Sequence, residues 1–394
     1  MDKVYQSKKD CCGCGMCMTV CPKHAIQMHR DEMGFVYPEI MQDVCVNCGA
    51  CQKICSFSKR KEQRIDKGTL DCYAACNINK EELSKSTSGG AFSAISHTFL
   101  ENGGAVVGAC MKLDTGKVHV YHTVIEEQDE LAELQGSKYV QSNLLECIDT
   151  MDKILRNGKN VLFSGTPCQV DAVKRRFGNY IETQLYTIDI ICHGVPNQKF
   201  LCDFLNEYQI KDKKELKKIV FRDKEYGWGL NGKLITVDDK IIKFTKNEFS
   251  YYKYFLDGET YRESCYACPY ACMERVGDIT IGDYWGVKKY DPQLLVENGG
   301  SFDFKQGISC VIVNNVRGKE LLKNFGANIQ KAPIELQHVL QINKQLREPA
   351  KHTDLRNKIF SLYTRKGYSG VERLFERQKI YRSIKNKIKA IIKK

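Results

Sequence analysis

Eight cysteines near the N-terminus form two copies of one pattern. Each copy reads C-x2-C-x2-C-x3-C, and Pro22 follows the first copy whereas Ser56 follows the second. The cysteines of the two runs are Cys11, Cys14, Cys17 and Cys21, and Cys45, Cys48, Cys51 and Cys55. A cubane iron–sulfur cluster takes three thiolates from one tight loop and the fourth from elsewhere. Two complete runs therefore predict two 4Fe-4S clusters.

The fourth cysteine of each run is expected to bind the other cluster, as in bacterial two-cluster ferredoxins. The expected ligand sets are Cys11, Cys14, Cys17 and Cys55 for one cluster, and Cys45, Cys48, Cys51 and Cys21 for the other. Gly13, Gly15 and Gly49 suit loops whose backbone N–H groups turn toward the cluster sulfurs. Cys12 is left over. The alternative is zinc, which thiolates also bind.

Further cysteines lie at the ends of predicted elements. Cys265 and Cys268 form a C-x2-C pair, Cys192 follows a predicted strand, and Cys168 falls in the first turn of a predicted helix, where the helix dipole stabilises a thiolate. These four predict a third metal site. Cys272 competes for a place in it, and a small zinc knuckle is the alternative. The cysteines expected to be buried and inert are Cys72, Cys76, Cys110, Cys147, Cys202 and Cys310.

Charge and hydrophobic spacing divide the chain into domains. Residues 1–58 form the predicted two-cluster ferredoxin-like domain, and the polar residues 59–70 form a linker. Residues 71–350 form a larger domain, and residues 351–394 form a basic helical tail.

The larger domain alternates between helix and strand signals. Phe92, Ile95 and Phe99 fall on one face of a predicted helix, and another helix opens at Pro167. Predicted strands span 105–109, 161–163 and 185–191, and residues 232–245 have the pattern of an antiparallel hairpin. The expected fold class is α+β or mixed α/β, with a mixed sheet.

Two Gly-containing stretches could hold a phosphate group. In residues 86–90 the hydroxyls and free N–H groups of a helix start would face an anion, although ordinary helix capping explains the same residues. Lys138 and Tyr139, within residues 136–142, could hold a phosphate and an aromatic ring, or form a surface turn. The chain has no G-x-G-x-x-G or Walker signature.

Together these motifs resemble the coenzyme F420 hydrogenase/dehydrogenase beta-subunit family. The motifs that carry the resemblance are the ferredoxin module followed by STSGGAFSAI, GSKYVQS, FSGTPCQV, ICHGVP, CYACPY, RVGDITIGDYWG and GISCVIVNN. The resemblance covers roughly residues 8–345. It fixes the class of cofactor better than the substrate. The family pattern does not require a cysteine at Cys272, which favours Cys168 and Cys192 as the partners of Cys265 and Cys268.

The resemblance implies an iron–sulfur flavoprotein that binds FAD. Several family members pass electrons between clusters and a deazaflavin coenzyme, and relatives in other lineages reduce chlorophyll-type substrates. Many bacterial members occur with polysaccharide-synthesis genes and have no established substrate. Iron–sulfur clusters move single electrons, and a flavin converts these into the pairs that organic substrates accept. We expect the flavin phosphates near Ser88, Gly89 and Gly90. We expect the isoalloxazine ring near Gly136, Ser137, Lys138, Tyr139 and Gln141.

Three side chains are candidates for proton transfer. His193 follows the expected ligand Cys192, and Asp278 and Asp283 flank a predicted strand after the C-x2-C pair. Structural roles are the alternative, because aspartates cap turns and His193 would orient its loop. Residues 221–229, which contain Arg222 and Trp228, suit an anionic planar ligand or ordinary aromatic packing.

The amino-acid composition indicates the expected cellular compartment and the expected binding partners. The chain has 394 residues and 20 cysteines, opens without an apolar signal segment, and is expected in a reducing cytoplasm. Residues 372–394 carry nine Lys or Arg against two Glu, which is +7 of the formal +12. Ile380, Ile384, Ile388 and Ile391 follow helical spacing beneath that charge. The tail is expected to dock on an anionic membrane surface, on a partner, or on its own domain. No sequence motif indicates that the chain binds nucleic acid.

Three functions from different classes follow from these patterns. In the preferred one, electrons from a ferredoxin or another redox protein pass through the clusters to FAD, which reduces a small organic substrate or a deazaflavin. In the second, the chain is a non-catalytic electron-transfer subunit that feeds a partner enzyme, with polysaccharide biosynthesis as one setting. In the third, the clusters are structural or sense oxidation.

Overall fold

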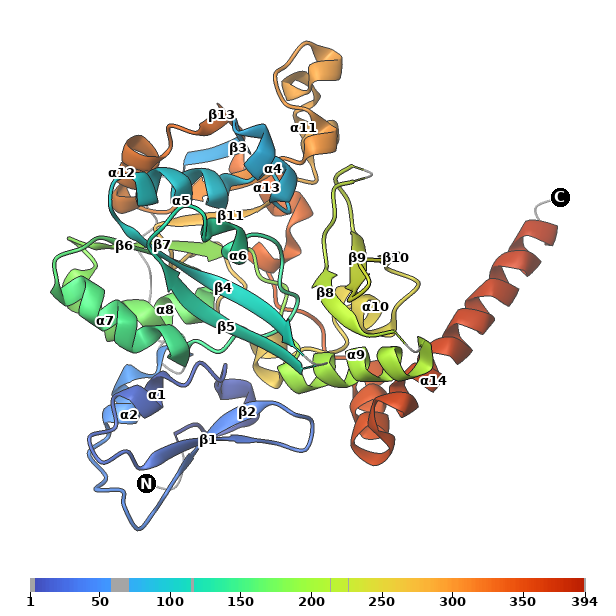
Figure 1. The fold of residues 1–394 in the computed structure, drawn as a ribbon, viewed down its shortest axis with the longest axis horizontal. Coiled ribbons are helices and arrows are strands. Elements are labelled where there is room, and N and C mark those ends of the chain that lie inside the picture. The colour runs from blue at the N-terminus through green and yellow to red at the C-terminus, as the bar shows by residue number, and fades with distance from the viewer. Residues whose placement is uncertain (1–3, 58–70, 115–116, 213, 226, 393–394) are drawn as a thin grey trace.

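The computed structural model describes residues 4–57, 71–114, 117–212, 214–225 and 227–392, with side chains up to Lys385. The predicted linker at residues 59–70 lies outside the described residues. The N-terminal module contains helices α1 (Met16–Thr19) and α2 (Ala50–Ile54) and the antiparallel pair β1 (Ile26–Arg30) and β2 (Val36–Ile40). Figure 1 shows this module beneath the larger domain.

An eight-stranded mixed sheet forms the larger domain, in the order β13-β3-β12-β11-β7-β6-β4-β5. The strands are β3 (Asp71–Asn77), β4 (Ala105–Asp114), β5 (Lys117–Ile125), β6 (Val161–Gly165), β7 (Leu185–Ile190), β11 (Ile279–Asp283), β12 (Ser309–Val313) and β13 (Ile329–Pro333). Neighbouring strands from β4 to β11 are parallel, and the remaining pairs are antiparallel. The predicted mixed sheet is therefore confirmed, and its parallel centre gathers the carboxyl ends of β6 and β7 at one edge.

Helices cover both faces of this sheet because alternate strand residues point to opposite sides (Figure 1). Val106 and Leu162 pack with α5 (Ala91–Glu101) and α12 (Val316–Phe325). Val107 and Phe163 pack with α7 (Ile148–Arg156) and α8 (Pro167–Arg176). The expected helix face of residues 92–99 belongs to α5, and Pro167 opens α8 at the position where a missing N–H costs nothing. Shorter helices are α4 (Lys80–Lys85), α6 (Leu131–Leu134), α11 (Val287–Tyr290) and α13 (Leu336–Ile342).

A second, three-stranded sheet stands beside the first. It contains β8 (Leu216–Val220), β9 (Asn231–Thr236) and β10 (Ile241–Thr245), of which β9 and β10 are the expected hairpin. An aromatic core joins it to α9 (Gln198–Asp212), α10 (Ser250–Leu256) and α14 (Asp354–Ile392). α14 bends at Gly367, whose φ is 62°.

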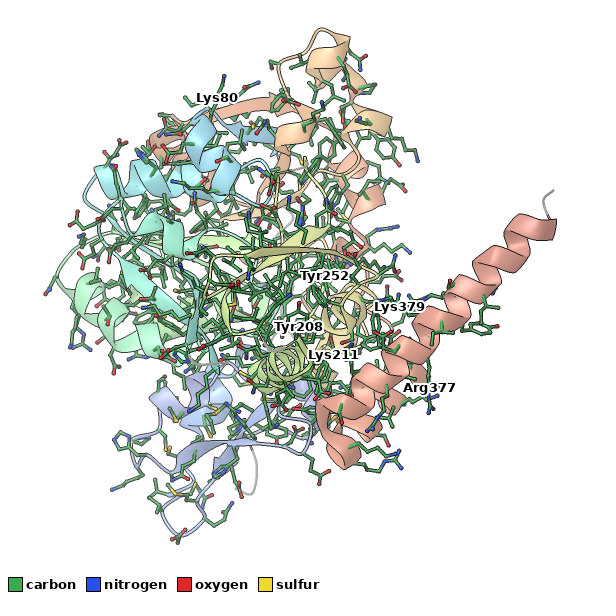
Figure 2. The ribbon with its side chains drawn as sticks, turned by 45° about the vertical axis from the view of Figure 1, so that its right-hand side comes forward. Lys80, Tyr208, Lys211, Tyr252, Arg377 and Lys379 are labelled. Atoms are coloured by element: carbon green, nitrogen blue, oxygen red, sulfur yellow. The ribbon has the colours of Figure 1, made fainter. Side chains whose placement is uncertain are left out.

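The last part of α14 extends away from the body of the protein. Figure 2 shows Arg377 and Lys379 on this extension. Within the described residues, every helix is too short or too polar to span a lipid bilayer.

Candidate functional site

The N-terminal module brings the two predicted thiol groups together in the crossed arrangement. Burial raises the pKa of Cys17, and the nearby thiols of Cys14, Cys11 and Cys55 raise it further. Cys55, the last cysteine of the second run, therefore lies near the first group, and Cys51 of the second group also acts on Cys17. The loops at Gly13, Gly15 and Gly49 have positive φ values of 67°, 77° and 73°, a conformation that glycine adopts without strain.

The second group lies nearer the surface. Burial raises the pKa of Cys51, and Cys48 and Cys21 are its closest thiol neighbours. Cys45 packs in the same small core as Cys21 and Cys51, and Cys48 is exposed. All four cysteines line one small cavity. This grouping is the crossed set expected for the second cluster.

A third group of thiols lies above the N-terminal module. Cys168 is the second residue of α8, and Cys192 follows β7. Cys265 lies in a short 3-10 helix, Glu263–Ala267, and Cys268 caps its end. Burial raises the pKa of Cys265, and the thiols of Cys192 and Cys168 raise it further. The four thiols line one cavity. Among the described residues, no three His, Cys, Asp or Glu side chains have the spacing of a single-ion site.

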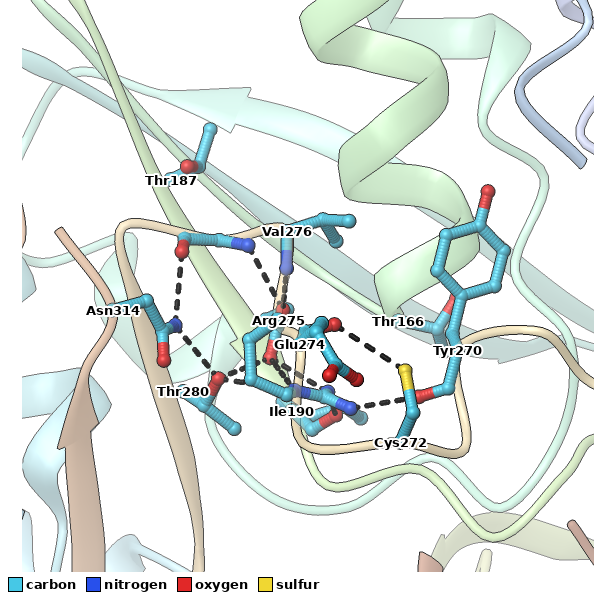
Figure 3. Close-up of polar contacts among 12 residues, drawn as sticks. Thr166, Thr187, Ile190, Tyr270, Cys272, Glu274, Arg275, Val276, Thr280 and Asn314 are labelled. Atoms are coloured by element: carbon cyan, nitrogen blue, oxygen red, sulfur yellow. Dashed lines mark hydrogen bonds and ion pairs between the residues drawn. The ribbon is translucent and has the colours of Figure 1, made fainter. Parts of the chain in front are cut away.

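Cys272 does not line that cavity. Its Sγ instead donates to the carbonyl oxygens of Pro269 and Glu274, at 3.4 Å each. Figure 3 shows Cys272 turned toward Glu274. The structure therefore brings Cys168 and Cys192, rather than Cys272, to Cys265 and Cys268.

A buried polar network fixes the loop that carries these cysteines. Arg275 Nη2 pairs with Asp189 Oδ1 at 2.8 Å, and the hydroxyl of Thr280 donates to the same oxygen at 2.7 Å. Asp189, on β7, also accepts the backbone N–H groups of Val276 and Gly277. Arg275 then donates from Nη1 to the carbonyl of Tyr270 (Figure 3). The paired carboxylate makes this a satisfied buried network, which holds the loop in one geometry.

Cys12 connects the first and third thiol groups. Cys12 is buried, and the neighbouring thiols of Cys14 and Cys168 raise its pKa. Met16 and Phe57 of the N-terminal module pack in the same core as α7 and α8. The two thiol groups are therefore neighbours across the boundary between the module and the larger domain.

A larger cavity of about 290 Å³ lies at the carboxyl edge of the parallel strands. Six of the eight residues predicted to bind the flavin line it: Ser88, Gly90, Gly136, Ser137, Lys138 and Tyr139. Gly89 lies behind the wall, where an added Cβ would stand 2.2 Å from the carbonyl oxygen of Ala75. Gln141 instead lines the thiol cavity, which is the cavity lined by Cys168, Cys192, Cys265 and Cys268.

Lys138 and Tyr139 have other partners than the phosphate and ring considered from sequence. The ammonium of Lys138 donates to the carbonyls of Glu133, Leu134 and Gln135 at 3.1, 2.9 and 2.7 Å, which caps the end of α6. Burial lowers its pKa to about 7. The Tyr139 ring stacks on Phe255 with a centroid distance of 4.2 Å. Both side chains therefore shape the cavity wall.

The two proposed catalytic residues lie in different surroundings. His193 lines both cavities, its side chain is exposed, and desolvation by the surrounding protein lowers its pKa. Asp283 lines neither: its carboxylate pairs with Arg222 at 3.0 Å and accepts Trp228 Nε1 at 3.0 Å. The Trp228 ring stacks on Trp285 with centroids 4.1 Å apart, so residues 221–229 form an aromatic and ionic packing unit.

The contacts of Asp278 give it a structural role. Its buried Oδ2 accepts both the N–H and the hydroxyl of Thr187, at 2.7 and 2.8 Å, and its Oδ1 accepts Asn315 Nδ2 at 3.0 Å. These bonds tie β7 to the loop before α12.

The sequence patterns do not predict two of the residues that the structure places at the site. Arg262 is fully buried between Cys11 and Gln141, and His122 lines the larger cavity with its ring stacked on Phe163. The position of Arg262, three residues before Cys265, is the one available signal that it lies near a metal site. Nothing in the spacing predicts its burial.

Family models match three stretches of the chain. A 4Fe-4S dicluster domain matches residues 10–58. The coenzyme F420 hydrogenase/dehydrogenase beta subunit N-term and C terminus match residues 72–149 and 158–337. With the thiol groups described above, these matches define an iron–sulfur oxidoreductase. The chain belongs to the coenzyme F420 hydrogenase/dehydrogenase beta-subunit family, which confirms the resemblance found in the sequence.

Among solved structures, the chain is similar to a chain of the F420-reducing NiFe hydrogenase complex from Methanosarcina barkeri. The TM-score is 0.46 and the identity 18%, over 75% of this chain and 92% of that chain. A search of the curated proteins finds no match.

Proposed function

We propose that this chain accepts electrons from a redox protein and passes them through three 4Fe-4S clusters to FAD, for reduction of a small organic acceptor of the deazaflavin class. One observation carries the proposal: residues 192–195 line both the thiol cavity and the larger cavity. Val140, Ser142, Thr166 and Gln169 also line both, so the two cavities share a wall, which is the arrangement that electron transfer between cofactors in them requires.

The residues present suit these groups. Each of the three thiol groups contains four cysteines, the ligand number of a cubane cluster. The larger cavity lies at the carboxyl ends of parallel strands, the usual place for a ligand in an open α/β sheet. Clusters supply single-electron transfer, and a flavin couples it to two-electron chemistry.

The order of the thiol groups gives the route. Cys21, Cys45, Cys48 and Cys51 lie nearest the surface, Cys12 joins the first group to Cys168, and Cys192 borders the larger cavity. Electrons would therefore enter at the exposed Cys48. Val44 and Val46 beside it are 39% and 56% exposed, an apolar rim suited to transient docking of a redox protein.

The side chains around the larger cavity would position the bound groups and exchange protons with them. His193 is exposed at the wall shared by the two cavities, so its ring can accept or donate a proton there. We retain it as the proton-transfer residue. Asp283 holds Arg222, whose Nη1 also donates to the hydroxyl of Tyr139 at 3.3 Å. Asp283 therefore acts through Tyr139 as a positioning residue.

The test is reduction of candidate acceptors by the anaerobically reconstituted protein. Reduced wild type should transfer electrons to a deazaflavin, and His193→Phe should slow that transfer while iron and flavin contents stay unchanged. A loaded protein that reduces a partner protein but no small acceptor would instead support the electron-transfer subunit.

We also propose that the end of α14 docks on an anionic membrane surface. Ile380, Tyr381 and Ile384 are 60%, 67% and 51% exposed on the extended helix. Ile388 and Ile391, which continue this spacing, lie outside the described side chains. Six cationic residues line the adjacent cavity of about 600 Å³: Lys253, Lys358, Lys366, Arg373, Arg377 and Arg382. Isoleucines beside a dense positive charge suit a bilayer with anionic lipids.

Vesicle cosedimentation tests this docking. The protein should bind vesicles that contain phosphatidylglycerol, and not phosphatidylcholine alone. Replacing both Ile380 and Ile384 by Ser should abolish binding, whereas Ile210→Ser, at a residue 76% exposed on α9, should not. Binding that ignores both changes would contradict the proposal.

A further inference from the structure

Four arginines are buried among the residues that the structure describes, and one of them differs from the rest. Three pair with carboxylates at 3.0, 2.8 and 2.7 Å: Arg222 with Asp283, Arg275 with Asp189, and Arg356 with Glu263. The fourth, Arg262, has a relative exposure of 0% and no carboxylate within ion-pair distance in the described part of the chain. A guanidinium stays charged inside a protein.

Every hydrogen-bond acceptor of Arg262 is neutral. Its Nε donates to the carbonyl oxygen of Cys11 at 2.9 Å, its Nη1 to Oε1 of Gln141 at 3.0 Å, and its Nη2 to the carbonyl of Val36. The guanidinium also lies over the Tyr37 ring, 4.2 Å from its centroid. These contacts use three of its five N–H donors and leave a net positive charge out of water, which is costly unless an anion lies close by.

The nearest loop carries the ligands of the first thiol group. An added Cβ at Gly13 would stand 2.5 Å from Nη2 of Arg262, so the loop backbone touches the guanidinium. The same loop carries Cys11, Cys14 and Cys17. Four thiolates around a cubane cluster give this group the negative charge that the arginine lacks.

We infer that Arg262 is the counter-charge of the cluster held by Cys11, Cys14, Cys17 and Cys55, and that it raises the midpoint potential of that cluster. The inference rests on the proposed function. Each one-electron reduction, by an electron from the redox-protein donor, adds one negative charge to the cluster. A fixed positive charge therefore stabilises the reduced state more than the oxidised state.

Arg262 also lies on the route between two thiol groups. It is three residues before Cys265, and its backbone N–H donates to the carbonyl of Val195 at 2.9 Å, in a loop that lines both cavities. A higher potential at the first cluster would hold an electron beside the third group. Arg262 is thus a positioning residue that acts through the cluster.

An EPR-monitored redox titration of the reconstituted holoprotein tests this role. Arg262→Gln removes the positive charge. Arg262→Lys keeps the charge but loses the planar guanidinium and its several N–H donors. The control is Lys8→Gln: Lys8 lies 5.4 Å from the Tyr37 centroid, but its side chain is 44% exposed and pairs with Asp31 at 2.7 Å. We expect one cluster signal to shift to a more negative potential in Arg262→Gln, less in Arg262→Lys, and not in Lys8→Gln.

Iron content separates the remaining outcomes. If Arg262→Gln loses about four irons while Arg262→Lys keeps them, the charge is needed to hold the cluster, which supports the inference. Equal shifts of potential or equal iron loss in both variants would overturn the inference. The effect would then come from the planar shape of the guanidinium and not from its charge. Unchanged potentials in Arg262→Gln would overturn it too. If the wild type binds no clusters, the proposed function fails first, and the absent iron identifies that failure.

Discussion

Gln141 Nε2 donates a hydrogen bond to the backbone carbonyl of Cys12 at 2.9 Å. Residues 136–140 of the same loop line the larger cavity, so one short segment contacts both candidate cofactor sites. Oε1 of Gln141 accepts Nη1 of Arg262 at 3.0 Å, which completes a bridge from the N-terminal module to the cavity wall. This amide is therefore one of the contacts that align the first thiol group with the larger domain.

Removing the Gln141 amide should weaken electron transfer without removing a cofactor. Gln141→Ala leaves the Cys12 carbonyl and one Arg262 donor unpaired, a loss of about 1–3 kcal/mol. We expect flavin reduction to slow about tenfold after the clusters are reduced, measured by stopped-flow absorbance. Gln330→Ala removes an exposed amide that bonds Ser301, and should leave the rate unchanged. Equal rates in all three proteins would contradict the bridging role.

Cys168→Ala should remove the third cluster alone. Cys168 is one of four thiols that line the same cavity, and a cubane cluster bound by three thiols is expected to lose its iron. Iron analysis should give about four irons fewer per chain than the wild type, with the two N-terminal clusters retained. Cys72→Ala, at a buried thiol of β3 distant from the three groups, is the control. Unchanged iron in Cys168→Ala would rule out the third cluster.

Gly89→Ala should destabilise the protein because the new methyl group has no room. Its Cβ would stand 2.2 Å from the Ala75 carbonyl oxygen and 2.5 Å from the Ser309 amide nitrogen, both in backbone. Overpacking of this kind costs about 1–3 kcal/mol and would move the residues that line the larger cavity. Flavin content and thermal stability should both fall. Gly178→Ala, where no atom lies within 4 Å of the new Cβ, should change neither.

The buried His122 predicts sensitivity to acid. Burial lowers its pKa from 6.5 to about 4, so between these values the unfolded chain binds a proton that the folded protein does not. The stability that this group confers is therefore present above pH 6.5 and is lost as the pH falls toward 4. From pH 7 to pH 5 the loss is about 2 kcal/mol.

The comparison that isolates His122 uses His122→Gln, which cannot ionise but can still donate to the carbonyl of Ser164, the 3.2 Å partner of His122 Nε2. Urea unfolding at pH 7 and pH 5 should show a smaller acid-induced loss in this variant. Identical losses in both proteins would mean that His122 titrates normally.

Much of the fold was predictable because local signals agree with the tertiary structure. The spacing of residues 91–101, the proline that opens α8 and the hairpin of β9 and β10 all appear as expected. The capping of α5 differs: its N-cap is Gly90, in the left-handed region, and not one of the hydroxyls of residues 86–88. The placement of β12 and β13 on either side of β3 was not predictable, since it depends on long-range pairing that no short pattern encodes.

The candidate site divides in the same way. The two runs of cysteines followed from ligand spacing, and the crossed position of Cys55 was expected by analogy with bacterial two-cluster ferredoxins. The orientation of Gln141 toward Cys12 and the burial of Arg262 were not predictable, because long polar side chains next to a motif can point either way.

The most direct test of the central claim is the iron, acid-labile sulfide and flavin content of protein purified without oxygen, with its visible spectrum. Three clusters and one flavin predict about twelve irons, about twelve sulfides and one flavin per chain, and a brown colour that bleaches with dithionite. A colourless protein that contains zinc and no sulfide would contradict the account.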